Sequence, residues 1–229
     1  MALGLEGKQV VITGGDGALG RAVVEAFTAA GAACHLPILG AAGTESGPGA
    51  RITGNVDLTD DGAVTAYFTG LPPLWASVHL AGGYQAKPMA ETTRADFERQ
   101  LLLNLATAFL SCREAVKAMR GSGEGGGRIV NVAARVVEVP VAGAVAYSVS
   151  KAGVAALTRS LAVEVRGDGI LVNAILPSII DTPANRAAMP NADTARWPKP
   201  DELAGTILWL ASPENRLTSG ALVPVYGRA

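Results

Sequence analysis

Short apolar runs rich in β-branched residues alternate along the chain with longer segments of helical character. Each run has the length and composition of a strand buried on both faces. We therefore predict strands at residues 8–13, 32–36, 51–56, 74–80, 127–132, 169–176 and 221–225. The segments between them predict helices at residues 21–30, 93–120, 147–166 and 201–211. This alternation indicates βαβ units, so the expected fold class is α/β, with one doubly wound parallel sheet of about seven strands.

Two helix starts carry local signals of their own. Residues 59–61, with the sequence TDD, predict a helix cap because short polar side chains accept hydrogen bonds from first-turn N–H groups. Thr93 followed three residues later by Asp96 resembles a capping box, which opens the helix that runs to about residue 120.

A glycine-rich turn, residues 13–20 with the sequence TGGDGALG, separates the first predicted strand from the first helix. Glycines allow a tight turn and a close approach of the backbone to a ligand. The helix that follows offers unpaired N–H groups and a partial positive charge to a pyrophosphate. Glycine turns also join strands to helices where no ligand binds, so this pattern alone leaves both interpretations open.

The remaining distinctive residues fall at the ends of predicted strands. They are Asp57, Ala81 with Gly82, Ala133 with Ala134, and the segment 177–182. In open parallel sheets, ligands bind beyond the carboxyl ends of the strands. We therefore expect a binding site along this one edge.

Tyr147 and Lys151 lie four residues apart at the head of a predicted helix, so they share one face. A nearby cation favours the phenolate, so we expect Lys151 to lower the pKa of Tyr147. A tyrosine tuned in this way can exchange a proton with an alcohol or carbonyl oxygen. The same spacing also occurs on solvated helix faces and is weak evidence by itself.

Composition and charge favour a single globular domain and argue against nucleic-acid, metal and membrane binding. Hydrophobic residues make up 49% of the 229 residues and charged residues 17%, which favours one large core and a single domain spanning 1–229. The formal net charge of −1 gives no basic footprint for nucleic acid. Cys34 and Cys112 lack metal-ligand spacing and are expected to be buried thiols, with no metal site. Without a signal-like start or a long apolar run, we expect no membrane contact and a cytoplasmic protein.

Seven segments, in this order, resemble the motifs of one family. They are the turn at 13–20, Asp57-Leu58, His79-Leu80-Ala81-Gly82, Asn104 within LLLNLATAF, GRIVN at 127–131, Tyr147 with Lys151, and Pro177-Ser178 with Thr182. Over nearly its whole length the chain resembles a short-chain dehydrogenase/reductase, a family with a Rossmann-type domain.

The resemblance implies hydride transfer between a nicotinamide dinucleotide, NAD or NADP, and a small carbonyl or alcohol. It implies that Tyr147 is the proton donor or acceptor, that Lys151 depresses its pKa and binds the nicotinamide ribose, and that Asn104 positions a relay water. These three are the expected catalytic residues. The implied cofactor-binding residues are Gly14, Asp16, Leu19, Gly20, Asp57, Leu58, Ala81, Gly82, Tyr147, Lys151, Pro177, Ile180 and Thr182.

The chain departs from the family pattern at several positions. Ala134 stands where the family has its catalytic serine, and no serine or threonine occurs between residues 124 and 147. Loss of a comparable oxyanion donor costs on the order of 10²–10³ in rate. Ser178, where the family has glycine, either lends a hydroxyl or caps a turn. Ala18 takes the place of the middle glycine, where its methyl either crowds the pyrophosphate or is tolerated.

The residue that selects the cofactor is also missing. Dinucleotide folds usually place an acid or an arginine about 20 residues beyond the turn, and residues 26–44 contain neither. Asp16 would repel a 2′-phosphate and no basic residue lies within the turn, so NAD is favoured over NADP; weak binding of either fits equally. His79 replaces an asparagine and is expected to be packed or adjacent to the ribose rather than an acid–base group. His35 is expected to be packed.

Two hypotheses remain. The first is an oxidoreductase with an altered oxyanion site, whose substrate lid spans residues 184–200 with Arg186, Arg196 and Trp197. The second is a catalytically impaired relative with a dinucleotide-binding or regulatory role. The family also implies a homodimer or homotetramer that packs through the helices near Asn104 and Tyr147.

Overall fold

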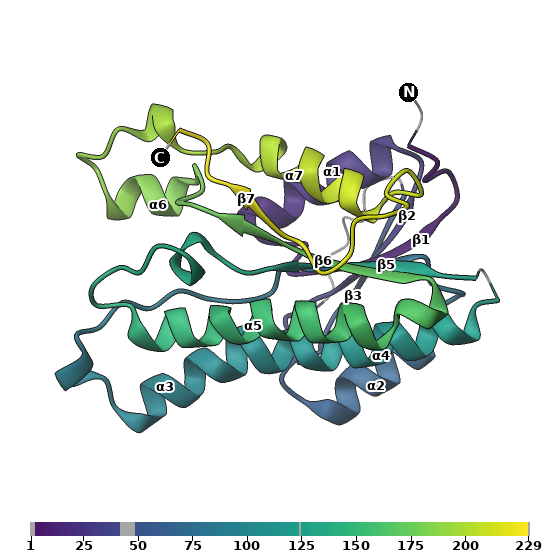
Figure 1. The fold of residues 1–229 in the computed structure, drawn as a ribbon, viewed down its shortest axis with the longest axis horizontal. Coiled ribbons are helices and arrows are strands. Elements are labelled where there is room, and N and C mark those ends of the chain that lie inside the picture. Colours follow the sequence, from purple (N-terminus) through teal and green to yellow (C-terminus); the bar gives the residue numbers. More distant parts are fainter. Residues whose placement is uncertain (1–2, 42–48, 124, 229) are drawn as a thin grey trace.

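A computed structural model describes residues 3–41, 49–123 and 125–228. Its centre is a seven-stranded parallel sheet in the order β3-β2-β1-β4-β5-β6-β7 (Figure 1). The strands are β1 (Gln9–Thr13), β2 (Ala33–Pro37), β3 (Ala50–Thr53), β4 (Ala76–His79), β5 (Gly127–Val132), β6 (Ile170–Pro177) and β7 (Leu222–Val225). The strand order reverses between β1 and β4, so the sheet is doubly wound and has its ligand-binding edge there. The predicted fold class is confirmed.

Helices cover both faces of the sheet. They are α1 (Ala18–Ala29), α2 (Asp61–Thr69), α3 (Arg94–Leu101), α4 (Thr107–Gly121), α5 (Val145–Glu164), α6 (Pro183–Ala188) and α7 (Pro200–Ala211). Figure 1 shows α1 and α7 on one face and α2, α4 and α5 on the other, with α6 beyond one end of the strands. The layers follow from strand alternation, since neighbouring residues of a strand point to opposite faces. On β1, Val10 and Ile12 join the core under α1 and α7, whereas Val11 joins the core under α2 and α4.

Most predicted strands lie within two or three residues of their observed bounds, and 127–132 is reproduced without a shift. The largest difference is the third strand, which ends at Thr53 rather than at residue 56. Asn55 adopts a positive φ of 57° and turns the chain there. Asparagine is one of the few residues that tolerate this left-handed conformation.

Both predicted helix caps are present. Asp60 accepts a hydrogen bond from the Ala63 N–H, 2.7 Å away, and α2 begins at Asp61. Thr93 and Asp96 form a reciprocal capping box at the start of α3. The long helix expected from this point is interrupted by a π-helical segment, Leu102–Ala106, before it continues as α4.

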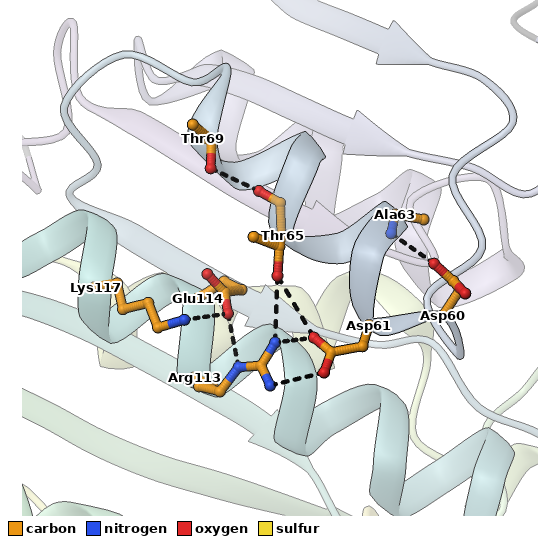
Figure 2. A network of polar contacts seen from close by, with 8 residues as sticks. All are labelled: Asp60, Asp61, Ala63, Thr65, Thr69, Arg113, Glu114 and Lys117. Atoms are coloured by element: carbon orange, nitrogen blue, oxygen red, sulfur yellow. Dashed lines mark hydrogen bonds and ion pairs between the residues drawn. The ribbon is translucent and has the colours of Figure 1, made fainter.

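An ionic network joins α2 to α4 (Figure 2). The Arg113 guanidinium lies between Asp61 on α2 and its neighbour Glu114, whose carboxylate also accepts a 2.8 Å hydrogen bond from Lys117. The Glu114 side chain is only 4% exposed. Burial acts to raise the pKa of Glu114, but the hydrogen bonds from Lys117 and Arg113 outweigh it and lower that pKa overall.

Candidate active site

The glycine turn is shaped by close backbone contacts. Gly14 has a φ of +65°, and a side chain on it would stand 2.9 Å from the Ala81 N atom. A side chain on Gly20 would overlap the carbonyl of Gly14. Both positions therefore require glycine. The turn thus packs directly on the end of β4, where Ala81 and Gly82 follow the strand.

The start of α1 suits an anionic ligand. Its N-cap is Gly17, which has no side chain to occupy the first-turn N–H groups. Such N–H groups bind phosphate at helix N-termini. Ala18 begins the helix and is exposed. The residues present at the turn therefore fit a dinucleotide pyrophosphate.

The edge near β2 and β3 holds the residues expected at the adenosine. Asp57 accepts hydrogen bonds from the Thr59 hydroxyl at 2.7 Å and the Thr59 N–H at 2.8 Å, and these lower its pKa. Asp16 is exposed at the turn. The Arg21 side chain folds back onto the turn, where its Nε donates to the Asp16 carbonyl at 3.3 Å. This basic group lies beside the turn, so the expectation that favoured NAD over NADP is weakened. Part of the segment beyond β2, residues 42–48, lies outside the described residues.

Asn104 lies in the π-helical segment and faces the loop after β4. Its Oδ1 accepts from the Gly83 N–H at 3.0 Å, and its Nδ2 donates to the Gly83 carbonyl at 2.9 Å. The same Nδ2 also donates to the Gln100 carbonyl, one turn earlier, at 3.2 Å. A side chain on Gly82 would stand 2.5 Å from Asn104 Oδ1 and 3.6 Å from Lys151 Nζ. Asn104 and Lys151 therefore meet around Gly82.

Lys151 is buried on α5, and its Nζ donates to the Val132 carbonyl at 2.8 Å. Its ammonium lies 5.9 Å from the centre of the Tyr147 ring. Burial lowers the pKa of Lys151 to about 8. The predicted shared face of Tyr147 and Lys151 is thus present at the carboxyl end of β5.

The expected direction of the Tyr147 pKa shift is wrong in this structure. Burial, with a smaller contribution from the charge of Tyr84, raises the pKa of Tyr147 to about 12. Desolvation opposes ionisation of the phenol, while Lys151 directs its ammonium toward the Val132 carbonyl. Tyr147 is therefore a protonated phenol at neutral pH.

Neither Ala134 nor Ser178 offers a free hydroxyl group to a substrate oxygen. Ala134 is buried, and its methyl group cannot hydrogen-bond. The Ser178 hydroxyl donates to the Tyr226 carbonyl at 2.7 Å, which favours the turn-capping interpretation of this residue.

The loop after β6 contains the other expected residues. Pro177 ends β6, and the Thr182 side chain caps α6 by accepting from the Asn185 N–H at 3.2 Å. The Ile180 carbonyl accepts from the Asn185 side chain at 2.8 Å. These residues lie on the same edge of the sheet as the turn.

In the segment expected as a lid, both arginines are held by contacts within the chain although their side chains are exposed. Arg186 pairs with Asp181 at 2.5 Å, and Arg196 donates to the Arg228 carbonyl at 2.9 Å. Trp197 is 7% exposed and is therefore packed.

His79 is a packed residue, as expected. Its Nδ1 lies 2.8 Å from Asn131 Oδ1, and its Nε2 lies 2.8 Å from the Ser77 hydroxyl. Asn131 donates its own N–H group to Thr158, so its oxygen faces the histidine, which carries its proton on Nδ1. Burial lowers the pKa of His79 to about 4, so the ring is neutral. Cys34 and Cys112 are both buried free thiols, as predicted.

Tyr84 was missed by sequence reasoning. It follows Gly83 in the loop after β4, and its ring packs edge-to-face on Tyr147 with centroids 4.9 Å apart. No spacing rule links residues 84 and 147, and the one available signal was an aromatic residue just beyond a strand end. Within the described residues, no cluster of three or more histidines, cysteines or carboxylates could hold a metal ion.

Comparison with known proteins agrees with the fold. The profile of the family described as enoyl-(acyl carrier protein) reductase matches residues 15–227. The chain belongs to the short-chain dehydrogenase/reductase family.

Relatives of similar length include proteins named as dehydrogenases. Galactitol 2-dehydrogenase from Rhizobium johnstonii is 35% identical, with 96% of this chain and 94% of the relative aligned. D-threitol dehydrogenase from Mycolicibacterium smegmatis is 30% identical, with 97% and 93% aligned. The crystal structure of a putative gluconate dehydrogenase from Agrobacterium tumefaciens superposes with a TM-score of 0.87 at 30% identity, covering 99% of this chain and 97% of that one. Among the described residues of the present chain, no helix is long and apolar enough to span a membrane.

Proposed function

We propose that this protein is an NAD(P)-dependent oxidoreductase that interconverts a small alcohol and its carbonyl compound. The observation that carries the proposal is that Asn104 and Lys151 meet around Gly82 while Lys151 lies 5.9 Å from the centre of the Tyr147 ring, on the same sheet edge as the glycine turn. When bound, the nicotinamide would supply the hydride chemistry. Two relatives are named as dehydrogenases of galactitol and of D-threitol. Sugar alcohols and the matching ketoses are therefore the first substrates to test.

In the reducing direction, Tyr147 gives its phenolic proton to the carbonyl oxygen as that oxygen becomes an alcohol. A pKa near 12 keeps this proton in place at neutral pH. Lys151, with a pKa lowered to about 8, can return a proton toward the phenolate, since at neutral pH it is mostly charged. Asn104 holds the loop after β4 in place through its two hydrogen bonds to the Gly83 backbone.

The proposal extends to the residues that would hold the dinucleotide. Gly14, Gly20 and the start of α1 would hold the pyrophosphate, for which the turn has the required backbone space. The nicotinamide end would lie against Ala81, Gly82 and the loop of Pro177, Ile180 and Thr182. Leu19, Asp57, Leu58 and Asp16 would lie on the adenosine side.

We infer one functional unit over 1–229, with residues 184–200 closing over the substrate. We also infer a homodimer or homotetramer through α4 and α5, which expose Phe109, Val149 and Val163. Close packing of Gly153 against Leu105 shows that the small residues of α5 also serve contacts within the chain.

The test combines nucleotide binding with turnover. NADH and NADPH are titrated by fluorescence, and then sugar alcohols and ketoses are screened for nucleotide-dependent turnover. We expect binding of at least one nucleotide and turnover by the wild type. If neither nucleotide binds, the oxidoreductase proposal is wrong. Binding with turnover only after Ala134→Ser would instead favour the impaired, dinucleotide-binding relative.

A further inference from the structure

Tyr84 and Tyr147 form a pair of phenols on two different elements. Tyr147 lies in the first turns of α5, whereas Tyr84 lies in the loop after β4. Their rings meet at an interplanar angle of 84° with centroids 4.9 Å apart. This edge-to-face arrangement is one that aromatic pairs prefer. The ring of Tyr84 is therefore placed by Tyr147 itself.

The loop that carries Tyr84 is held on both sides. Just before it, the Asn104 side chain binds the N–H and the carbonyl of Gly83. Beyond it, the Lys87 N–H donates to the Gly143 carbonyl at 2.6 Å, just ahead of α5. The Lys87 side chain also pairs with Asp96 at 2.7 Å. Two anchors on the elements around the site thus fix the backbone from which Tyr84 projects.

The hydroxyl of Tyr84 is available. The residue is 64% exposed, although its ring contacts the phenol of the site. Among the described residues its hydroxyl makes no hydrogen bond. Ala134 and Ser178, by contrast, present a methyl group and a hydroxyl that already donates to Tyr226. Of these three residues, Tyr84 is the one whose hydroxyl is free to donate to a ligand atom.

We propose that Tyr84 is a catalytic residue whose hydroxyl donates a second hydrogen bond to the substrate oxygen that Tyr147 protonates. The inference rests on the proposed oxidoreductase function and deepens it. In carbonyl reduction, the carbon gains a hydride from the reduced nicotinamide dinucleotide, and the oxygen gains the Tyr147 proton. Tyr84 keeps its own proton and stabilises the negative charge that develops on the oxygen. The substrate oxygen is thus held between two phenols from different elements.

An electrostatic observation supports the pairing. After burial, the charge of Tyr84 is the other contribution that raises the pKa of Tyr147. This contribution agrees with the close approach of the two rings, whose centroids lie 4.9 Å apart. Tyr84 also offers a flat apolar ring beside the reacting group.

The experiment compares the wild type, Tyr84→Phe and the double variant Tyr84→Phe with Ala134→Ser. We expect Tyr84→Phe to lower kcat on the order of 10²-fold, the cost of losing an oxyanion donor, with unchanged Kd for the nucleotide. Adding Ala134→Ser should restore part of that loss, because a serine there supplies a hydroxyl from the neighbouring loop. Equal kcat in Tyr84→Phe and the wild type would overturn the proposal.

A second measurement separates this inference from the proposed function. If no substrate turns over in the wild type, the oxidoreductase proposal fails by itself, and tyrosinate absorbance is then titrated without nucleotide. The Tyr147 signal is assigned by its loss in Tyr147→Phe. We expect the pKa of Tyr147 to fall in Tyr84→Phe. An unchanged pKa would show that the two hydroxyls do not share a space and would overturn the role of Tyr84.

Discussion

Asn104 binds Gly83 through both backbone groups, with its Oδ1 3.0 Å from the Gly83 nitrogen and its Nδ2 2.9 Å from the Gly83 carbonyl oxygen. One side chain thereby fixes the loop that passes Lys151 and leads to Tyr84. The contact leaves no space for a side chain on the preceding residue, Gly82. The helix that carries Asn104 and the loop after β4 therefore act as one rigid part of the site.

Gly82→Ala should damage the site without unfolding the protein. The new methyl would stand 2.5 Å from Asn104 Oδ1, so Asn104 must move and release Gly83. We expect kcat/KM to fall at least on the order of 10-fold, since small displacements of positioning groups are costly in enzymes. The matched control is Gly205→Ala on α7, where an added Cβ meets nothing within 4 Å. Steady-state kinetics on both variants would decide, and wild-type kcat/KM in Gly82→Ala would show that Asn104 does not position the site.

Tyr147→Phe should lower kcat by about 10²–10⁴, the usual contribution of a general acid or base. The variant removes the phenolic proton but keeps the ring that packs on Tyr84. Tyr67→Phe is the matched control, because the buried Tyr67 hydroxyl has no hydrogen-bond partner among the described residues. Both variants should keep the far-ultraviolet circular dichroism of the wild type. Full activity in Tyr147→Phe would remove Tyr147 from the proposed mechanism.

The direction of the reaction should depend on pH through Lys151. Its pKa, lowered by burial to about 8, means that the neutral amine, which can accept a proton, prevails only above that pH. We expect kcat/KM for alcohol oxidation to rise through about pH 8, whereas carbonyl reduction falls over the same range. Lys151→Arg should abolish both inflections, because a guanidinium stays protonated throughout. Persistence of the inflection in Lys151→Arg would assign it to another group.

His79 should make the fold sensitive to acid. Burial lowers its pKa from 6.5 to about 4, so between these values the unfolded chain binds a proton that the folded protein does not. Stability therefore falls as pH falls through this range, with a full loss on the order of 3 kcal/mol. Urea denaturation of the wild type and of His79→Asn between pH 7 and about pH 4 tests this. The variant should lose much less stability over that range, and identical pH dependence in both proteins would refute the assignment.

The Arg113 network should contribute more to stability than an exposed ion pair does. Arg113→Met removes one of the two cations beside the Glu114 carboxylate, which is 4% exposed, and also the link from α4 to Asp61 on α2 (Figure 2). Removing one partner leaves a buried carboxylate poorly compensated. The control is Arg94→Met, whose pair with Glu98 is 90% and 55% exposed and should be worth less than about 0.5 kcal/mol. Thermal denaturation should therefore give a lower Tm for Arg113→Met than for Arg94→Met, and the reverse order would contradict this account.

Local sequence determined much of the fold. The cap at Asp60 and the box at Thr93 and Asp96 involve residues three apart, so no distant contact is needed to form them. Apolar runs located the parallel strands because strands covered on both faces have few polar positions. The meeting of Tyr147 and Lys151 followed from helix geometry alone.

Tertiary structure decided what local spacing does not encode. The pKa of Tyr147 depends on how much water the surrounding elements exclude, and burial reversed the shift expected from the neighbouring lysine. Tyr84 meets Tyr147 across 63 positions of sequence (147 − 84), and Arg21 returns to the turn through a side-chain contact. The contact between Asn104, in the π-helical segment, and Gly83 likewise joins two different elements. Sequence alone thus determined which groups stand at the sheet edge, because that follows from strand order and helix period. Only packing decided which of those groups touch and whether each carries its proton, because contact and desolvation depend on the whole fold.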